Sequence, residues 1–362
     1  MARGTRKKKS LFFGITSRTL MTISAMLLVL SYLSMYCNPA KFWFMTIFGL
    51  LFLPLLLMNA FLLFWAAYRR SRAIIIPLLA LIPSVFIVGR FIRFSEPNAS
   101  AEDKDGIKIV SYNVGRFMLA QEDEKPSIEA CADSVLNFLK GENADIICLQ
   151  EFYTRNSKKV MSYLSKKLKG YDIQYFVNVN DYGCYGNVTL SKYRAVAKGK
   201  IDFEQSANLA LYSDYVIGGE PFRVYNCHFE SYNISLSRLA TSLEKDYQKT
   251  MKDTEIKMKR SIVRRPRQVS KVLEDIENCT ENVIIAGDFN DNPMSYTYWR
   301  LRKTGKDSFV EAGHGTGATF TRFSPFLRID YILFPETYNA LSHKVIKKNY
   351  SDHYPIEAII SK

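Results

Sequence analysis

Acidic residues are missing from the first quarter of the chain. Residues 1–95 contain twelve Lys and Arg but no Asp or Glu, whereas the rest of the chain has 37 basic and 35 acidic residues. The formal net charge of +14 therefore comes almost entirely from the N-terminal region. A high net charge is often typical of nucleic-acid binding, but the near-neutral remainder gives that interpretation little support.

Cysteine and histidine are also scarce. The six cysteines form no CxxC pair and have no regular spacing, which argues against a disulfide framework. Cys148 and Cys227 lie within apolar strand patterns, where a free cysteine behaves as a small hydrophobe. Of the four histidines, His228 and His353 follow apolar strands and lie in polar motifs, whereas the other two have no such context.

The N-terminal region has long stretches without charge. Three of them, of 22, 27 and 17 residues, are Thr19–Ala40, Phe42–Tyr68 and Ala73–Gly89. A membrane span needs about 20 apolar residues. We therefore expect residues 1–94 to be a membrane anchor with about three transmembrane helices. A cleaved signal peptide is the alternative for the first stretch, but further apolar segments follow at once and no small-residue cleavage site stands out.

Positive charge in the short flanks predicts the orientation of this anchor. Nine Lys and Arg lie before the first stretch and between the second and third, against one in the first loop. The pattern predicts an integral protein of the inner membrane with its C-terminal domain outside the cytoplasm. Arg90 and Arg93 oppose this orientation, and the domain would face the cytoplasm if the third segment lay in the interface.

The rest of the chain is predicted to form a linker followed by one domain. Residues 95–106 (SEPNASAEDKDG) are polar and contain Pro and Gly, which is typical of a linker. Short apolar runs bounded by turn residues then predict strands at Ile107–Tyr112, Asp145–Leu149, Ile173–Val179, Leu209–Ile217, Phe222–Cys227, Val283–Ala286, Ile329–Phe334 and Ile356–Ile360. Helical spacing occurs at Ser127–Lys140 and Ser157–Leu168. We expect an α/β fold with two antiparallel or mixed sheets packed face to face and helices outside.

One segment, Ser235–Glu277, is long, basic and free of glycine. Residues 236–271 hold eleven Lys and Arg against four Asp and Glu. The simpler interpretation is a solvated amphipathic helix. The functional alternative is a basic arm that touches anionic lipid or a polyphosphate chain.

Six short motifs each put a polar residue at the end of an apolar strand. They are SYN (Ser111–Asn113), LQE (Leu149–Glu151), NCH (Asn226–His228), GDFN (Gly287–Asn290), RIDY (Arg328–Tyr331) and SDH (Ser351–His353). Hydrolysis of a phosphodiester needs a hard cation, a base that activates water, and a group that stabilises the developing charge. The residue types in these motifs can supply all three.

The carboxylates of LQE and GDFN have the chemistry of a metal ligand and of a general base. Glu151 follows the apolar run DIICLQ, where a carboxylate is costly unless it is paired or bound to metal. Mg²⁺ prefers oxygen ligands and needs only one or two carboxylates. In GDFN, Asp288 and Asn290 point the same way at a spacing of two. We expect Asp288 to take a proton from water and the amide of Asn290 to donate to phosphate.

The last two motifs are complementary. An Asp that accepts from an imidazole N–H fixes the tautomer of the histidine and raises its basicity. Asp330 and His353 are the candidates for this pair, and Asp352 is a candidate metal ligand or orienting group.

Together the motifs resemble the endonuclease/exonuclease/phosphatase superfamily, in particular its deoxyribonuclease- and sphingomyelinase-like members. SYNV, LQE, GNVTLSK, NCHFES, RRPRQ, GDFND, RIDYI and SDHYPI occur in the family's order, and the resemblance covers about Lys108 to Ile360. It implies a four-layer α/β sandwich over residues 107–362 and a phosphoesterase that depends on Mg²⁺ or Mn²⁺.

The resemblance also implies roles for individual residues. It suggests Asn113 and Glu151 at the metal, Asp288 and Asn290 at the water and phosphate, and the Asp330–His353 pair opposite them. A histidine at the place of His228 is typical of pancreatic-type deoxyribonucleases, sphingomyelinases and some phosphoinositide phosphatases, and apurinic-site nucleases usually lack it. Many DNA-repair members have an acidic residue where this chain has Gly115, which weakens the repair interpretation.

The sequence therefore predicts a membrane-anchored, metal-dependent phosphodiesterase or phosphatase. Its expected partners are the membrane and a phosphoester substrate, either a lipid head group, a nucleic acid or a small phosphodiester, with no obligate protein partner. A nuclease acting on DNA or RNA is the alternative within the family. A non-catalytic, membrane-tethered interaction domain would require the loss of catalytic residues, and none is missing. A transporter would need polar residues in the spans, where only Asn59 stands out.

Overall fold

The computed structural model describes residues 2–95, 106–118, 127–180, 183–232 and 247–362. The chain forms two compact units, one of Met1–Gly89 with Met294–Tyr296 and one of Arg90–Pro293 with Thr297–Lys362. The expected linker at 95–106 lies outside the described residues except for its two ends. The first part of the basic segment, 235–246, also lies outside them.

The N-terminal unit is helical. It comprises α1 (Ala2–Ser34), α2 (Met45–Leu50), α3 (Phe52–Tyr68), the 3₁₀ turn η1 (Arg72–Ile74), α4 (Ile75–Leu81) and the 3₁₀ segment η2 (Ile82–Phe86). Within the described residues, only Ile15–Ser34, with 20 residues and a mean hydropathy of 1.3, is long and apolar enough to cross a membrane. The same length and composition also fit a signal sequence. The other two expected spans form shorter apolar helices at Phe52–Tyr68 and Arg72–Phe86.

Backbone breaks explain why the second and third apolar stretches are divided. Leu51 has φ −87° and ψ 7°, so α2 ends before α3 begins. Pro83 lies at the start of η2, where the helix tightens. Asn59 is fully buried and donates to the backbone oxygen of Ser24 over 3.0 Å, which ties α3 to α1. Many large apolar side chains of this unit are exposed, which is typical of a surface that meets lipid or another apolar partner.

The second unit contains two six-stranded mixed sheets. The first has the order β13-β14-β2-β3-β5-β4, from β13 (Asn339–Val345), β14 (Ile356–Ser361), β2 (Ile107–Asn113), β3 (Ile146–Thr154), β5 (Gly183–Ser191) and β4 (Asp172–Asn180). The second has the order β10-β12-β9-β8-β7-β6, from β10 (Lys306–Asp307), β12 (Asp330–Phe334), β9 (Asn282–Asp288), β8 (Glu220–His228), β7 (Leu209–Ile217) and β6 (Ala197–Asp202). A separate pair joins β1 (Ile92–Arg93) to β11 (Gly315–Thr316).

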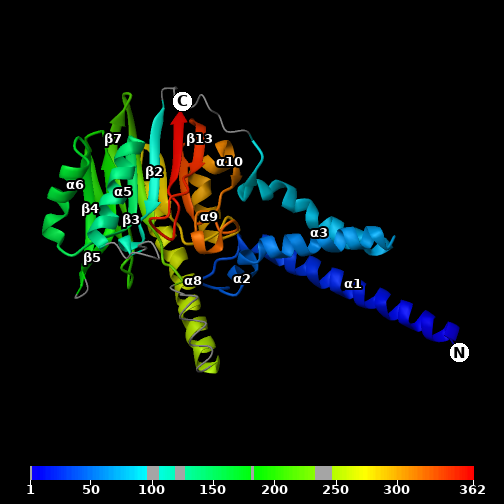
Figure 1. The fold of residues 1–362 in the computed structure, drawn as a ribbon. Helices are drawn as coiled ribbons and strands as arrows, with labels where there is room; N and C mark the ends of the chain where they lie inside the picture. The colour runs from blue at the N-terminus through cyan, green and yellow to red at the C-terminus, as the bar shows by residue number, and fades with distance from the viewer. Residues whose placement is uncertain (1, 96–105, 119–126, 181–182, 233–246) are drawn as a thin grey trace. The chain divides into compact units, whose positions relative to one another are not determined.

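Helices flank the strands of this unit (Figure 1), and apolar clusters of the described residues pack between the layers. Side chains such as Ile109 and Ile284 fill the space between the two sheets. The helices α5 (Ile128–Glu142) and α6 (Val160–Lys167) cover the first sheet through residues such as Leu136. The helices α8 (Tyr247–Glu277) and α9 (Tyr296–Leu301) cover the second, and α10 (Ser308–Ala312) follows β10. The expected α/β fold of two sheets flanked by helices is confirmed.

Most expected elements appear within a few residues of their predicted bounds. Ser127 caps α5 by accepting from the backbone N–H of Ala130, as a serine before a helix does. The strands β5, β6 and β13 were not expected. β6 and β13 are partly exposed, whereas β5 is mostly buried but carries the polar residues Asn187, Thr189 and Ser191 among its apolar ones. The basic segment forms the amphipathic helix α8, which buries Ile262, Val269 and Val272 and leaves its first turns exposed.

Candidate active site

The parallel pairs of strands place several functional side chains at one edge of the fold. β2 and β3 run parallel in the first sheet, with Asn113 opposite Gln150. β8 and β9 run parallel in the second sheet, with His228 opposite Asp288. Because parallel strands end at the same edge, the motifs SYN, NCH and GDFN lie at the carboxyl ends of β2, β8 and β9, and LQE lies in β3 opposite the end of β2.

Glu151 is not at the end of its strand as expected. β3 continues to Thr154, and its register with β5 shifts between Leu149 and Phe152. Glu151 itself has φ +51°, so the strand forms a bulge there. A positive φ is costly for a side chain with a Cβ and persists where the surroundings impose it, often at functional sites. The bulge takes Glu151 out of the pairing and brings its carboxylate next to Asn113.

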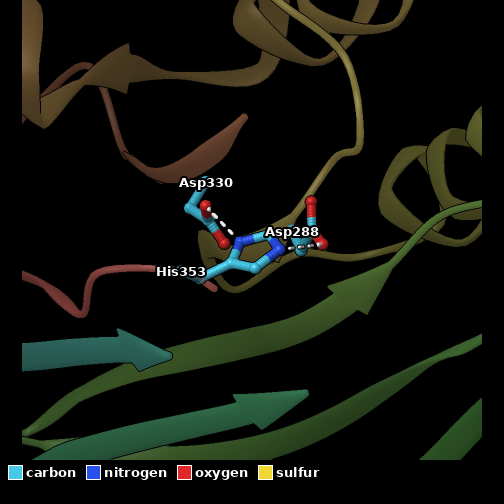
Figure 2. Close-up of side chains that lie close together, drawn as sticks. All are labelled: Asp288, Asp330 and His353. Atoms are coloured by element: carbon cyan, nitrogen blue, oxygen red, sulfur yellow. Dashed lines mark hydrogen bonds and ion pairs between the residues drawn. The ribbon is translucent and has the colours of Figure 1, made fainter. Parts of the chain in front are cut away.

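Asp288, Asp330 and His353 form a buried cluster, with one ligand atom of each within 4.8 Å of the others. Asp330 begins β12 and lies directly opposite Asp288, the last residue of β9. His353 comes from the segment before β14, and its Nδ1 is 2.9 Å from Asp330 Oδ2. Its Nε2 is 3.8 Å from Asp288 Oδ2, so the imidazole lies between the two carboxylates (Figure 2).

The metal-side residues adjoin this cluster. Asn113 Nδ2 donates to Asp288 Oδ2 over 2.9 Å and to Glu151 Oε1 over 3.4 Å. His228 Nε2 lies 3.7 Å from Glu151 Oε1 and 3.8 Å from Asp288 Oδ2. The first sheet therefore contributes Asn113 and Glu151 to the site, and the second sheet contributes His228 and Asp288.

Asn290 donates two hydrogen bonds to the carboxylate of Asp288. Its backbone N–H donates to Asp288 Oδ1 over 2.7 Å, and its amide nitrogen donates to Asp288 Oδ2 over 3.1 Å and to the carbonyl of Phe229 over 2.9 Å. Asn290 has φ +51°, which asparagine tolerates better than most residues. Both hydrogens of its amide are thus used within the protein, and its expected contact with phosphate stays a prediction.

Asp352 lies beside this cluster and is partly exposed. Its Oδ2 is 3.9 Å from Arg322 Nε, and its Oδ1 accepts from Ser351 Oγ over 3.5 Å. Ser351 also donates to the backbone oxygen of Asn113 over 2.7 Å and accepts from the backbone N–H of His353 over 3.2 Å. Ser351 therefore ties the SDH segment to the SYN strand, and the role of Asp352 at a metal stays a prediction.

Burial and charge shift the protonation of the central groups. Burial, together with the charge of Asp330, raises the pKa of Asp288 to about 7, although His353 acts in the opposite direction. Burial disfavours the charged form of His353, but Asp330 and Asp288 outweigh it and raise the pKa of His353 to about 10. The imidazole is therefore protonated at neutral pH, and the carboxyl of Asp288 can exchange a proton there.

Glu151 is ionised in the same setting. Burial opposes its ionisation, but His228 and Arg116 outweigh this effect and lower the pKa of Glu151. Burial lowers the pKa of His228, although the charge of Glu151 acts in the opposite direction. Arg116 Nε lies 3.3 Å from Glu151 Oε2, and its guanidinium stacks 4.5 Å from the centre of the Tyr185 ring.

These donors fit a hard divalent cation. Carboxylate oxygens, ligands that Mg²⁺ and Mn²⁺ favour, converge from Glu151, Asp288 and Asp330. Asn113 directs its amide nitrogen toward Glu151 and Asp288, and its amide oxygen accepts from the backbone N–H of Gly115. Among the described residues, Asp330 Oδ1 is buried without a hydrogen-bond partner. A buried polar atom of this kind needs a partner that the protein itself does not provide.

Sequence reasoning missed two residues behind the site. Gln150 and Asn226 are fully buried, and Gln150 Nε2 donates to Asn226 Oδ1 over 2.8 Å. Both lie inside the recognised motifs LQE and NCH. The available signal was an amide side chain within an otherwise apolar strand, because such a group must find partners inside the protein.

Comparison with known families agrees with this geometry. Residues 110–353, more than half of the chain, match the endonuclease/exonuclease/phosphatase family. The chain belongs to this family. Members of the endonuclease/exonuclease/phosphatase family are hydrolases that act on phosphoesters and generally depend on divalent metal. Residues 9–91 match a second family, described as a domain of unknown function (DUF8431).

Solved structures share the family fold. An endonuclease/exonuclease/phosphatase family protein from Leptotrichia buccalis C-1013-b is 16% identical, with a TM-score of 0.51, over 71% of this chain and 100% of that one. The endonuclease/exonuclease/phosphatase from Bacteroides vulgatus is 18% identical, with a TM-score of 0.50, over 71% and 99%. The human Nocturnin catalytic domain with bound sulfate is 17% identical, with a TM-score of 0.52, over 74% and 99%. No curated protein sequence matches this chain.

Proposed function

We propose that this protein is a membrane-anchored phosphodiesterase or phosphatase that depends on Mg²⁺ or Mn²⁺. The observation that carries the proposal is the convergence of Asn113, Glu151, His228, Asp288, Asp330 and His353 at one edge of the two sheets. A non-catalytic interaction domain has no need to keep a cluster of buried carboxylates and histidines in contact with one another.

Asp288 and His353 divide the chemistry of hydrolysis between them. Asp288 takes a proton from a water molecule, because its pKa of about 7 suits a general base at neutral pH. The water oxygen forms the new bond to phosphorus as the bond to the leaving oxygen breaks. The leaving oxygen then takes a proton from solvent, and Asp288 returns its proton to solvent. The protonated imidazole of His353, held by Asp330, donates a hydrogen bond to a phosphoryl oxygen and stabilises the charge there.

Glu151 and Asn113 would hold the cation, with Asp352 as a further ligand or orienting group. The bound ion supplies positive charge that neutralises the non-bridging oxygens of the phosphate. Asn290 keeps the carboxylate of Asp288 oriented through two hydrogen bonds. His228, with its Nε2 buried between Glu151 and Asp288, supplies a further donor to the phosphate.

The anchor brings this chemistry to a membrane surface. We infer that residues 1–94 hold the protein in the inner membrane, with the catalytic domain outside the cytoplasm. The nine Lys and Arg in the two inner flanks support this orientation, against one in the first outer loop. Lipid head groups or small phosphoesters are within reach there, whereas chromosomal DNA is not.

The test is hydrolysis by the purified full-length chain with Mg²⁺ or Mn²⁺, each compared with a chelator. The panel contains bis(4-nitrophenyl) phosphate, phosphoinositides, sphingomyelin, plasmid DNA and RNA. Turnover that stops in chelator and returns with metal supports the proposal. Equal rates with and without chelator reject it, and a preference for DNA or RNA makes the protein a nuclease.

A further inference from the structure

A cleft adjoins the candidate active site and has a volume of about 390 Å³. Glu151 and His228 of the site form part of its lining, and Tyr185 and Tyr232 contribute aromatic surface. Clefts that bind small molecules usually measure about 300–1,000 Å³. The space is therefore large enough for the organic part of a substrate whose phosphoester lies at the site.

The lining of this cleft is basic. Four of its side chains are Lys or Arg and two are Glu, and three of the four cations come from α8. Arg264 is already paired with Glu230 over 3.3 Å, and Arg116 with Glu151 over 3.3 Å. Lys257 and Arg260 have no acidic partner among the residues that the structure describes.

The helical spacing aims these two cations at the cleft. Lys257, Arg260, Ser261 and Arg264 follow one another at i, i+3, i+4 and i+7, which is one face of a helix, and all four line the cleft. Other exposed cations of α8, such as Lys252 and Arg267, do not line it. A solvated helix face would have no reason to direct its unpaired charges into the cleft that contains Glu151 and His228.

We propose that Lys257 and Arg260 bind a second phosphate group of the substrate, next to the phosphoester that is hydrolysed. This inference rests on the proposed function and specifies its substrate class. A phosphate monoester carries about −1.5 to −2 charges at neutral pH, which matches two unpaired cations. An ammonium and a guanidinium both bind phosphate oxygens through charge-assisted hydrogen bonds. Zwitterionic lipids such as sphingomyelin lack this group and are poor substrates on this basis.

The test compares phosphodiesters that differ only in a second phosphate. One pair is glycerophosphoinositol with and without a 4-phosphate, and the other is a thymidine dinucleotide with and without a 5′-phosphate. The full-length protein with Mg²⁺ should have a KM about tenfold lower or more for the phosphorylated member, because charged hydrogen bonds are strong. A lower KM for the phosphorylated member of the inositol pair alone assigns the second phosphate to a lipid head group. The same result in the dinucleotide pair alone assigns it to a nucleotide.

Two matched double variants locate the effect. Lys257→Gln with Arg260→Gln should remove the preference by raising KM for the phosphorylated member, while kcat and the KM of its partner stay unchanged. Lys252→Gln with Arg267→Gln removes the same charge from the same helix outside the cleft and should keep the preference. Salt should weaken the wild-type preference, because exposed charges are screened within about 8–10 Å at physiological ionic strength.

Equal KM values within both pairs, or an equal loss in the two double variants, would overturn the inference. If no probe is hydrolysed, the proposed function fails and binding decides the inference separately. Calorimetry with the same probes and Mg²⁺ should then show tighter binding of the phosphorylated members by the wild type and not by the Lys257/Arg260 variant. Equal affinities in that measurement would also overturn it.

Discussion

The side-chain amide of Gln150 donates to Asn226 Oδ1 over 2.8 Å and so joins the two sheets directly behind the site. Asn226 Nδ2 donates in turn to the carbonyls of Leu149 and Val188, over 3.1 and 2.9 Å. Gln150 precedes Glu151, and Asn226 lies two residues before His228 on the adjacent sheet. One buried hydrogen-bond network therefore fixes the position of both the metal-side carboxylate and the histidine opposite it.

Replacing Asn226 with alanine should lower the free energy of unfolding by about 3 kcal/mol, because buried donors and acceptors are left without partners. Asn178→Ala is the matched control, since the Asn178 amide makes an exposed bond to Ala207. We expect Asn178→Ala to lower the free energy of unfolding by less than about 1 kcal/mol. Urea denaturation measures both, and a double-mutant cycle with Gln150→Ala should give a coupling of about 1 kcal/mol or more. Additive effects of the two substitutions would contradict the network.

Removal of the general base and of the imidazole donor should reduce turnover. Asp288→Asn should lower kcat by about 10²–10⁴-fold, because a positioned general base contributes that much. His353→Ala should lower kcat by about 10²–10³-fold, because it removes a donor that stabilises charge in the transition state. His314→Ala removes an exposed histidine that contacts the backbone oxygen of Ser95 and should leave kcat unchanged. Steady-state kinetics on the best substrate of the panel, with circular dichroism for folding, measures these effects. Near wild-type turnover of His353→Ala would remove this histidine from the mechanism.

The pKa values of two buried histidines should be shifted in opposite directions. In metal-free protein, the pKa of His353 is raised to about 10 by the carboxylates that outweigh its burial, whereas burial lowers the pKa of His343 to about 3. An unfolded histidine titrates near 6.5. His353 therefore stabilises the fold fully below about pH 6.5, and this contribution is lost as the pH rises through 10. His343 has the reverse sign, because stability is lost as the pH falls below about 6.5.

With only four histidines, ¹³C-histidine NMR in chelator can resolve each titration. His353→Gln and His343→Gln assign the signals. Denaturation at pH 5, 7 and 9 should show that the stability difference between wild type and His353→Gln shrinks toward high pH. A signal for His353 that titrates near pH 6.5 would show that Asp330 and Asp288 do not hold its proton.

Glu151→Gln should mainly affect the metal requirement. The neutral amide keeps the shape of the side chain but removes the charge, so we expect the half-saturating Mg²⁺ concentration to rise about 10–100-fold. Glu129→Gln changes an exposed carboxylate on α5 and serves as the control. Metal titrations of activity measure both variants. An unchanged metal requirement in Glu151→Gln would exclude Glu151 as a metal ligand.

Reporter fusions test the orientation of the anchor. An alkaline phosphatase fused after Lys362 should be active and a green fluorescent protein at the same place should be dark, because we infer that the domain lies outside the cytoplasm. The same reporters fused after Arg70, in the second basic flank, should give the reverse result. Fluorescence at the C-terminus would place the domain with nucleic acids and favour the nuclease interpretation. Arg90 and Arg93 are the residues most able to cause that outcome.

The sequence by itself determined the order and type of the central elements. Alternation of apolar residues located β2 and β8, and buried apolar runs located β3 and β9, because those residues bury one or both faces of a strand wherever it pairs. The complementary motifs RID and SDH predicted a contact between Asp330 and His353, which the fold forms over 2.9 Å. Helical spacing over Ser127–Lys140 likewise predicted α5.

Only the tertiary structure decided the position of side chains that depend on distant partners. The bulge at Glu151 arises from pairing with β5, and no glycine in the LQE motif signals its positive φ. Asp288 meets Asp330 only because β9 and β12 are antiparallel neighbours in that register. The direction of Lys257 and Arg260 depends on which face of α8 packs on its sheet. Local sequence sets strand and helix periodicity, but register and helix rotation are set by burial against segments far away in the chain.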